Sequence, residues 1–207
     1  MNNAHFRRSF APHRPLIAAL ALSLGLGLVA CSKPDAPATP VSASPTAAPD
    51  LSYSKVVAEG KGFTVGVMMS ANTVYVLFDP QCPHCGHLWQ ASQALLGKAK
   101  FVWIPVSIIN AKSASQGAAL LGAANPTDLM AAHEASLLAG TGGLSDTAGP
   151  SPALQAIIKG NTQLFNDLAL ESVPFVVAKN ARTGQVVTHS GAMDAPALAQ
   201  WLGVDGP

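Results

Sequence analysis

The sequence predicts a single α/β domain, on the strength of two groups of apolar runs. A nearly continuous apolar run at residues 73–79 is followed by helical spacing at 83–98 and by another apolar run at 101–109. A crossover of strand, helix and strand places its two strands parallel in one sheet. Two further apolar runs, at 174–179 and 185–189, predict two more strands. Together these segments indicate a mixed sheet covered by helices.

The first half of the domain is expected to begin with strands at 63–69 and 73–79, both rich in β-branched and aromatic residues. The second of these is hydrophobic at almost every position, as is typical of a strand buried on both faces. Pro83 then stands where a proline is tolerated in the first turn of a helix, so the next helix is expected to begin there.

The middle of the chain predicts a helical insertion. Helical segments are expected at 113–123, 126–138 and 152–170, with a Gly-, Ser- and Pro-rich loop at 140–151. After the insertion, residues 180–184 join the last two strands in a hairpin, and a final helix covers 195–202. The expected order is two strands, a helix, a strand, the inserted helices, two strands and a helix.

Composition limits the possible partners. Of the 207 residues, 49% are hydrophobic and 11% are charged, which excludes a disordered polyelectrolyte. Arg7, Arg8 and Arg14 lie in a segment expected to be removed, and without them the 12 basic residues become nine, against 11 acidic ones. Nucleic acid is therefore not expected as a partner.

The N-terminus predicts export. The apolar run at 16–30 is short for a bilayer-spanning helix and suits a signal peptide. It ends in Leu-Val-Ala-Cys31, which resembles the lipobox of bacterial lipoproteins and predicts acylation of Cys31. The expected division is a signal peptide at 1–30, a Pro-, Ala- and Ser-rich tether at 31–50, and the domain at 51–207. An ordinary signal with an incidental cysteine, an uncleaved anchor, and either Sec or twin-arginine export stay open.

The motif Cys82-Pro83-His84-Cys85 follows a buried strand and opens a helix. Unpaired backbone N–H groups and the helix dipole stabilise a thiolate at that position, so Cys82 is the expected nucleophile. His84 is expected to lower the pKa of Cys82 further. Cys85 lies one turn along the same helix face, where it can attack a mixed disulfide on Cys82. The motif therefore predicts a redox-active disulfide between Cys82 and Cys85.

Other uses of the two cysteines are less favoured. A structural zinc site takes four ligands, and no second cysteine pair exists once Cys31 is acylated, although His84 and His87 could complete a distorted site. Attachment of a c-type haem needs histidine directly after the second cysteine, where this chain has Gly86. An inert disulfide across so short a loop would constrain the unfolded chain little. No metal or organic cofactor is expected.

The strand, C-x-x-C motif and helix, followed far downstream by Val173-Pro174 at the start of a strand, resemble the thioredoxin fold. In that superfamily the proline is cis and faces the dithiol, so the resemblance implies that Val173 and Pro174 bind the substrate chain. Over residues 74–202 the chain is similar to the catalytic domain of the DsbG and DsbC family. The similar stretches are YVLFDPQCPHCGHLW at 75–89, SASQGAALLGAANPTDLMAAHEAS at 113–136 and NTQLFNDLALESVPFVV at 161–177.

This resemblance implies an extracytoplasmic thiol:disulfide oxidoreductase that acts on cysteine-containing exported proteins and works with a membrane redox partner, a DsbD-like reductant or a DsbB-like oxidant. The Cys-Pro-His-Cys motif and Val173 are instead similar to the strongly oxidising DsbA. The direction of electron flow therefore stays open between oxidase, isomerase and reductase. The dimerisation domain of DsbG and DsbC has no counterpart in the sequence, so a monomer is expected. Acylation of Cys31 would anchor it to a membrane surface in the periplasm.

Two other functions compete with this interpretation: a Cu(I)-binding lipoprotein metallochaperone that uses the same dithiol, and a non-catalytic lipoprotein that binds a partner.

Exchange also requires a proton acceptor for Cys85. Thioredoxin and DsbA carry a buried acid six residues before the first cysteine, where this chain has Val76. The acceptor is expected to be water or Asp79, and His133 is expected at the surface.

Overall fold

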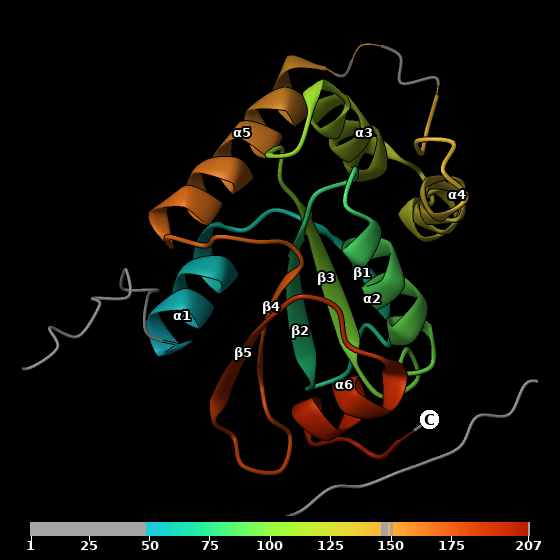
Figure 1. Ribbon diagram of the computed structural model, residues 1–207. Helices are drawn as coiled ribbons and strands as arrows, with labels where there is room; N and C mark the ends of the chain where they lie inside the picture. Colours follow the sequence, from blue (N-terminus) through green and yellow to red (C-terminus); the bar gives the residue numbers. More distant parts are fainter. Residues whose placement is uncertain (1–48, 146–148, 150, 207) are drawn as a thin grey trace, which may run out of the picture. The chain divides into compact units, whose positions relative to one another are not determined.

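Five strands form one mixed sheet in the order β1-β3-β2-β4-β5 (Figure 1). The computed structural model describes residues 49–145, 149 and 151–206, all within one unit of the chain. The strands are β1 (Phe63–Gly66), β2 (Thr73–Phe78), β3 (Lys100–Pro105), β4 (Phe175–Lys179) and β5 (Val186–Ser190). β2 and β3 pair in parallel, which confirms the predicted crossover, and the other three pairs are antiparallel.

Six helices surround this sheet within the described part of the chain. They are α1 (Pro49–Glu59), α2 (Pro83–Gln93), α3 (Ala111–Gly122), α4 (Pro126–Leu138), α5 (Pro152–Asp167) and α6 (Ala195–Leu202). Five of them, α1, α2, α4, α5 and α6, carry proline in the first turn, where its missing N–H has no helical partner to lose. Side chains cap four helix starts: Asn110, Asn125, Ser151 and Asp194.

Helix α1 was not predicted, and Pro49 and Asp50, assigned to the tether, form its first turn. Its contacts come from tertiary packing. Val56 is fully buried, Tyr53 meets Tyr75 edge to face with ring centroids 5.9 Å apart, and Lys179 lies over the Tyr53 ring. The predicted signal peptide, Cys31 and the tether up to residue 48 lie outside the described residues.

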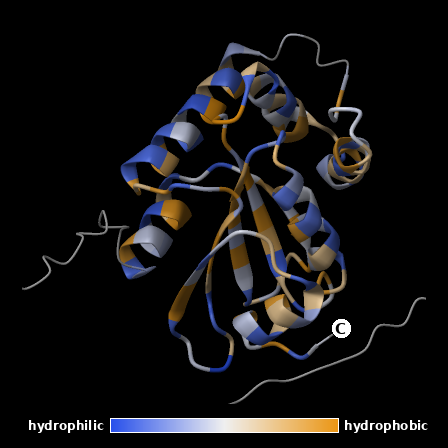
Figure 2. Ribbon diagram, in the orientation of Figure 1, coloured by the Kyte–Doolittle hydropathy of each residue, from blue (hydrophilic) through white to orange (hydrophobic). Residues whose placement is uncertain are grey.

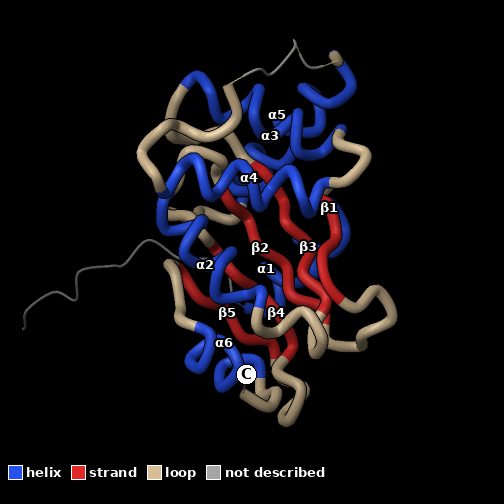
Figure 3. The backbone as a smooth tube through the Cα atoms, turned by 90° about the vertical axis from the view of Figure 1, so that its right-hand side faces the viewer, coloured by secondary structure: helices blue, strands red, loops and turns tan. Residues whose placement is uncertain are grey.

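The sheet is the middle layer of three. One apolar cluster joins β1, β2 and β3 to α2, α4 and α6, and a second joins β2, β3 and β4 to α1 and α5. Figure 3 shows α2 and α4 in front of the sheet and α1 behind it. Figure 2 shows hydrophobic residues concentrated along the strands, as expected for a sheet covered on both faces.

Two strands are shorter than the sequence predicts. β1 ends at Gly66, which has a φ of +99° that side-chain-bearing residues rarely adopt. A Cβ at this position would lie only 2.5 Å from the Ala99 carbonyl oxygen, so there is no room for a side chain. β3 ends at Pro105, because the N–H groups of Ile108 and Ile109 bind a carboxylate in place of a neighbouring strand. Within the described ranges, no helix combines the length and apolar character needed to cross a bilayer.

Candidate active site

The two described cysteines lie at the start of α2, directly after β2. Cys82 is the N-cap residue, with extended backbone at φ −98° and ψ 109°, and Pro83 occupies the first turn. The Cys82 N–H donates to the Asp79 carbonyl (2.9 Å), and the Cys82 carbonyl accepts from the Cys85 N–H (3.0 Å). Both thiols are free, and the residues are 4% and 0% exposed. The strand end and the helix start therefore hold both sulfur atoms in place.

The surroundings of Cys82 favour its thiolate. A hydrogen bond from the Cys85 thiol contributes most, and together with the backbone N–H groups of Cys85 and His84 it lowers the pKa of Cys82 to about 7 against the opposing effect of burial. The charge of His84 acts in the same direction and contributes least. A substantial fraction of Cys82 is therefore a thiolate near neutral pH. This thiolate accepts hydrogen bonds from backbone N–H groups that have no partner within the helix.

Cys85 is held as a thiol. Burial raises its pKa well above the ordinary value, and the hydrogen bond to Cys82 and the charges of Cys82 and Glu134 act in the same direction. The motif therefore contains one ionisable nucleophile and one protonated partner. Such a pair can carry out attack and resolution in sequence.

Val173 and Pro174 lie against Cys82, although they come from the other end of the chain. The Val173–Pro174 peptide bond is cis, and the Val173 carbonyl accepts a hydrogen bond from the Cys82 thiol at 3.5 Å. Pro174 is buried and Val173 is partly exposed. The structure thus brings together Cys82, Cys85, Val173 and Pro174 from the predicted set of site residues.

His84 and His87 lie on the outer side of α2. Both are exposed, and their ring centroids are 6.4 Å apart. Their rings face solvent beside the dithiol.

Asp79 is fully buried, but its carboxylate is already occupied. Oδ1 accepts from the N–H of Gln81 (2.8 Å), and Oδ2 accepts from those of Ile108 (2.7 Å) and Ile109 (3.0 Å). Three charge-assisted hydrogen bonds make this residue a clamp between the end of β2 and the loop after β3. The suggestion that Asp79 serves as the proton acceptor of Cys85 gains no support from this geometry.

A different carboxylate, which the sequence analysis missed, lies beside the dithiol. Glu134 of α4 is 1% exposed, and neither of its carboxylate oxygens has a hydrogen-bond partner among the described residues. An ideal Cβ on Gly86, the residue after Cys85, would lie 2.6 Å from Glu134 Oε2. Burial, followed by the charge of Cys82, raises the pKa of Glu134 to about 8. This carboxyl group can therefore gain or lose a proton near neutral pH.

The sequence did contain a signal for Glu134. One face of α4 is formed by residues at helical spacing: Met130, His133, Glu134 and Leu138. Because Met130 and Leu138 favour burial of this face, a carboxylate between them is expected to be buried as well. Met130, His133 and Glu134 are the buried residues of this helix.

His133 is fully buried, so its predicted place at the surface was wrong. Its Nδ1 accepts from the Leu144 N–H (3.2 Å), which leaves Nε2 to donate to the Pro80 carbonyl (2.7 Å). Burial lowers its pKa, which favours this neutral ring. His133 thereby ties α4 to the segment that leads into Cys82 and fixes the helix that carries Glu134.

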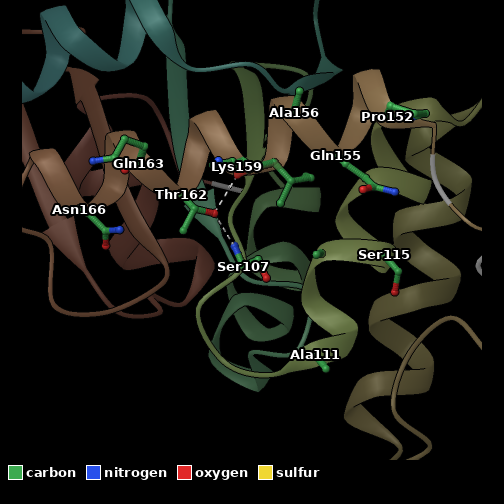
Figure 4. A pocket seen from close by; sticks show the side chains of 12 residues that line it. Ser107, Ala111, Ser115, Pro152, Gln155, Ala156, Lys159, Thr162, Gln163 and Asn166 are labelled. Atoms are coloured by element: carbon green, nitrogen blue, oxygen red, sulfur yellow. Dashed lines mark hydrogen bonds between the residues drawn. The ribbon is translucent and has the colours of Figure 1, made fainter.

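A pocket of about 770 Å³ lies apart from these residues, between α3 and α5 (Figure 4). Its floor includes the hydrogen bond from the Ser107 N–H to Thr162 Oγ1 (3.0 Å). No cysteine, histidine or carboxylate lines the pocket, and Lys159 is its one charged residue. The reactive groups of the described chain gather at the start of α2 instead.

No group of three or more His, Cys, Asp or Glu side chains in the described ranges is arranged to hold a metal ion. The alternative of a Cu(I)-binding metallochaperone finds no support in the comparisons with known proteins.

The DsbG proteins are homologous to this chain. The thiol:disulfide interchange protein DsbG of Pseudomonas aeruginosa is 30% identical over 132 residues, which are 63% of this chain and 50% of that protein. DsbG of Escherichia coli is 30% identical over 105 residues, 50% of this chain and 42% of that protein. The chain thus spans about half the length of the curated relatives it matches. No protein-family model matches it.

Solved structures share the fold. The catalytic domain of Proteus mirabilis ScsC aligns with a TM-score of 0.58 and 13% identity, covering 74% of this chain and 93% of that one. The thiol-disulfide exchange protein α-DsbA2 of Wolbachia pipientis aligns with a TM-score of 0.55 and 17% identity, covering 74% and 95%. The homology supports the prediction of a disulfide oxidoreductase. The chain is a homologue of the DsbG thiol:disulfide interchange proteins, and its fold is the thioredoxin-like fold that the sequence predicted.

Proposed function

We propose that the protein is a thiol:disulfide oxidoreductase that exchanges disulfides with cysteine-containing exported proteins through Cys82 and Cys85. The observation that carries the proposal is the asymmetry of the dithiol. Cys82 has a pKa of about 7, whereas burial raises that of Cys85 well above its ordinary value. Exchange is fastest when the attacking thiol has a pKa near the ambient pH, so Cys82 is suited to attack.

The cycle follows from this asymmetry. The Cys82 thiolate attacks a client disulfide and forms a mixed disulfide, and one client sulfur leaves as a thiolate. The Cys85 sulfur, once deprotonated, attacks Cys82, forms the Cys82–Cys85 disulfide and releases the second client sulfur. Run in reverse, the same steps transfer the disulfide to a client. His84 is proposed to stabilise the Cys82 thiolate, and Pro83 to set the start of the helix.

Client binding is proposed at the surface next to Cys82. Val173, partly exposed, contacts the Cys82 sulfur through its carbonyl, and Ile108 and Ile109 are 40% and 47% exposed in the loop that Asp79 holds. Exposed apolar side chains beside a reactive dithiol suit an extended or partly folded polypeptide. The Val173–Pro174 segment and this loop would then hold the client chain on two sides of the sulfur.

The pKa of Cys82 also bears on the direction of electron flow. A value of about 7 is close to that of the thioredoxin nucleophile, about 7, and lies above that of DsbA, about 3.5. A less stabilised thiolate means a less stabilised reduced form, and therefore a more reducing couple. We expect a reduction potential between about −120 mV, that of DsbA, and about −270 mV, that of thioredoxin. Such a couple favours reduction or isomerisation of client disulfides.

The cellular setting is also part of the proposal. Acylation of Cys31 would anchor the protein in the periplasm, where its dithiol would meet exported clients and a membrane redox partner. A couple more reducing than DsbA needs electrons, so a DsbD-like reductant fits better than a DsbB-like oxidant.

The test is a redox equilibrium with glutathione. The full chain carrying Cys31→Ser, whose dithiol supplies its only thiols, is equilibrated at defined ratios of reduced to oxidised glutathione and trapped with an alkylating reagent. A two-electron transition between the two potentials above supports the proposal. A protein in which Cys82 and Cys85 never form a disulfide contradicts it, and a potential near −120 mV makes it a disulfide donor.

A further inference from the structure

Among the described residues, the carboxyl group of Glu134 has no structural partner that explains its burial. Most buried polar groups in folded proteins are hydrogen-bonded, and an unpaired carboxyl group inside a protein costs free energy. Its two oxygens have no hydrogen-bond partner among the described residues, and the residue is 1% exposed. A group kept in this condition is a candidate for chemistry.

Gly86 is what allows this carboxyl group to reach α2. Helices α2 and α4 pack together, and at this point α2 presents a glycine directly after Cys85. A Cβ there would lie 2.6 Å from Glu134 Oε2 and 3.2 Å from Leu138 Cδ2. Gly86 lies in the first turn of a helix, where glycine lowers stability relative to alanine. Its presence leaves room for the carboxyl group beside the backbone of Gly86, the residue directly after Cys85.

We propose that Glu134 exchanges a proton with Cys85 during disulfide exchange, accepting it when Cys85 attacks the mixed disulfide and returning it when the Cys82–Cys85 disulfide is opened. The inference rests on the proposed function, since it names the proton acceptor of the same dithiol. Thioredoxin and DsbA carry a buried acid before their first cysteine, at the position where this chain has Val76. In this chain the proposal assigns that role to Glu134 on α4.

The step balances as follows. The Cys85 thiol gives its proton to the Glu134 carboxylate through one bridging water, because no hydrogen bond joins the two groups directly. The Cys85 sulfur forms a bond to Cys82. The bond between Cys82 and the client sulfur breaks, and the client leaves as a thiolate with the electron pair. Cys85 is oxidised, the client sulfur is reduced, and Glu134 ends as a carboxylic acid. In the reverse direction the client thiolate attacks Cys82, and Glu134 protonates the departing Cys85 sulfur.

The groups around Glu134 leave it as the available acceptor. α2 contributes Cys82 and Cys85, with His84 and His87 directed to solvent, and β1 carries no titratable side chain. α3 contributes Lys112, which is exposed and has its Nζ 3.6 Å from an ideal Cβ on Gly142. On α4 itself, Asp128 is exposed, and both ring nitrogens of His133 are engaged in hydrogen bonds. Asp79 accepts three backbone N–H groups.

The resolving step can be followed with the aromatic disulfide 5,5′-dithiobis(2-nitrobenzoic acid). The reduced full chain carrying Cys31→Ser releases one coloured thiolate when Cys82 attacks the reagent. It releases a second when Cys85 resolves the mixed disulfide. The second phase is intramolecular, so its rate does not depend on the reagent concentration. Its rate is measured from pH 6 to 10, alone and in combination with Glu134→Gln, Glu134→Asp and the control Glu59→Gln, which alters an exposed residue of α1.

The proposal predicts a characteristic pH profile. For the parent protein and Glu59→Gln the second phase should speed up as Glu134 ionises and then level off. The midpoint should lie at or below about pH 8, because the Cys82 charge that helps to raise the pKa of Glu134 to about 8 is absent from the mixed disulfide. Glu134→Gln should slow this phase at pH 7 by tenfold or more, since a general base contributes roughly 10²–10⁴-fold. Its rate should keep rising above pH 8 as Cys85 ionises unaided, so the two profiles converge. Glu134→Asp should keep the inflection at a reduced rate.

Two results would overturn the proposal. One is a profile for Glu134→Gln that matches that of Glu59→Gln; the other is an equal loss in Glu134→Asp and Glu134→Gln with no change in shape, which marks a structural role. Circular dichroism confirms that each variant is folded before its rates are compared. Should the parent protein release no thiolate in either phase, the proposed function itself fails, and that outcome differs from both.

Gly86→Ala supplies an independent check. The added methyl group should displace the carboxyl group and slow the second phase in the same pH-dependent way. If it acts through Glu134, the double variant Gly86→Ala/Glu134→Gln should be no slower than Glu134→Gln alone. Additive losses would show that the methyl group disturbs Cys85 directly and would remove Gly86 from the argument.

Discussion

The two faces of the sheet are both covered by helices, but they bury polar side chains under different conditions. On the α1 and α5 face, Asn161 is 1% exposed and fully hydrogen-bonded: Nδ2 donates to the carbonyls of Lys61 (2.8 Å) and Pro105 (3.0 Å), and Oδ1 accepts from the Lys61 N–H (3.0 Å). On the α2 and α4 face, Glu134 is equally buried and its carboxylate has no such partner within the described residues.

This difference indicates that Asn161 has a structural role and that Glu134 has a chemical one. A buried amide with every hydrogen bond made fixes the position of α5 and gains nothing by changing its protonation. A buried carboxyl group without partners, beside two thiols, has a pKa raised to about 8 and can change its charge near neutral pH. The comparison predicts that substitutions on the first face alter stability, and that substitutions on the second alter reactivity.

The largest effect is expected at the dithiol. Cys82→Ser should abolish disulfide exchange with glutathione while leaving thermal stability almost unchanged, because it removes the nucleophile and keeps the shape of the side chain. Cys85→Ser should let the first step proceed and accumulate the mixed disulfide on Cys82, which mass spectrometry detects. Residual turnover in Cys82→Ser would show that exchange does not depend on this thiolate.

A core substitution on the opposite face should act on stability alone. Leu164 of α5 is 2% exposed, and Leu164→Ala should lower the free energy of unfolding by about 2–5 kcal/mol. Urea unfolding measures this loss, and iodoacetamide alkylation should give the parent pH dependence for Cys82. A shifted dependence would mean that the two faces are coupled and would weaken the comparison.

The unpartnered carboxyl group should also make stability fall with pH. The pKa of Glu134 is raised from 4.5 to about 8 in the folded protein, so its contribution is fully present below pH 4.5 and is lost as pH rises through 8. Over that window the loss is about 1.4 kcal/mol per pH unit for this group. Glu134→Gln should therefore flatten the dependence.

Urea unfolding of the parent protein and Glu134→Gln between pH 4 and 9 measures this effect. Parallel pH curves for the two proteins would show that Glu134 ionises without penalty in the folded state. At pH 9, where Glu134 is ionised, Glu134→Gln should be more stable than the parent protein; equal stability there would contradict the prediction as well.

The smallest effect is expected at His84. His84→Ala keeps the backbone N–H that lowers the pKa of Cys82 and removes only the histidine charge, which contributes least to the shift. The pKa of Cys82 should rise by less than about one unit, measured by the pH dependence of alkylation. A larger rise would make the histidine the main determinant of thiolate stability, as the motif alone suggests.

The sequence predicted those parts of the fold that depend on local pattern. The apolar run of β2 and the proline of α2 correctly predict that the dithiol lies between a buried strand and the start of a helix. Both signals come from residues that are adjacent in the sequence. Helix α1 could not be predicted in this way. Its stability comes from contacts between Tyr53 and Tyr75, and between Tyr53 and Lys179, which are far apart in sequence.

The same limit applies to the site. The spacing of Cys82 and Cys85 was enough to predict their role, and the predicted role of Val173 and Pro174 came from the family resemblance. Glu134 and Gly86 reach each other only through the packing of α4 on α2, which no local pattern encodes. His133 was wrongly expected at the surface, since its two hydrogen-bond partners, the Pro80 carbonyl and the Leu144 N–H, become neighbours only in the folded chain.

The most direct test of the account is the pH dependence of alkylation of the two thiols in the reduced chain carrying Cys31→Ser. Iodoacetamide modification is resolved by peptide mass spectrometry, so Cys82 and Cys85 are followed separately. The account predicts half-maximal reactivity of Cys82 near pH 7, with Cys85 unmodified until well above pH 9. Equal reactivity of the two cysteines, with a common midpoint near pH 9, would contradict the asymmetry on which the proposed function rests.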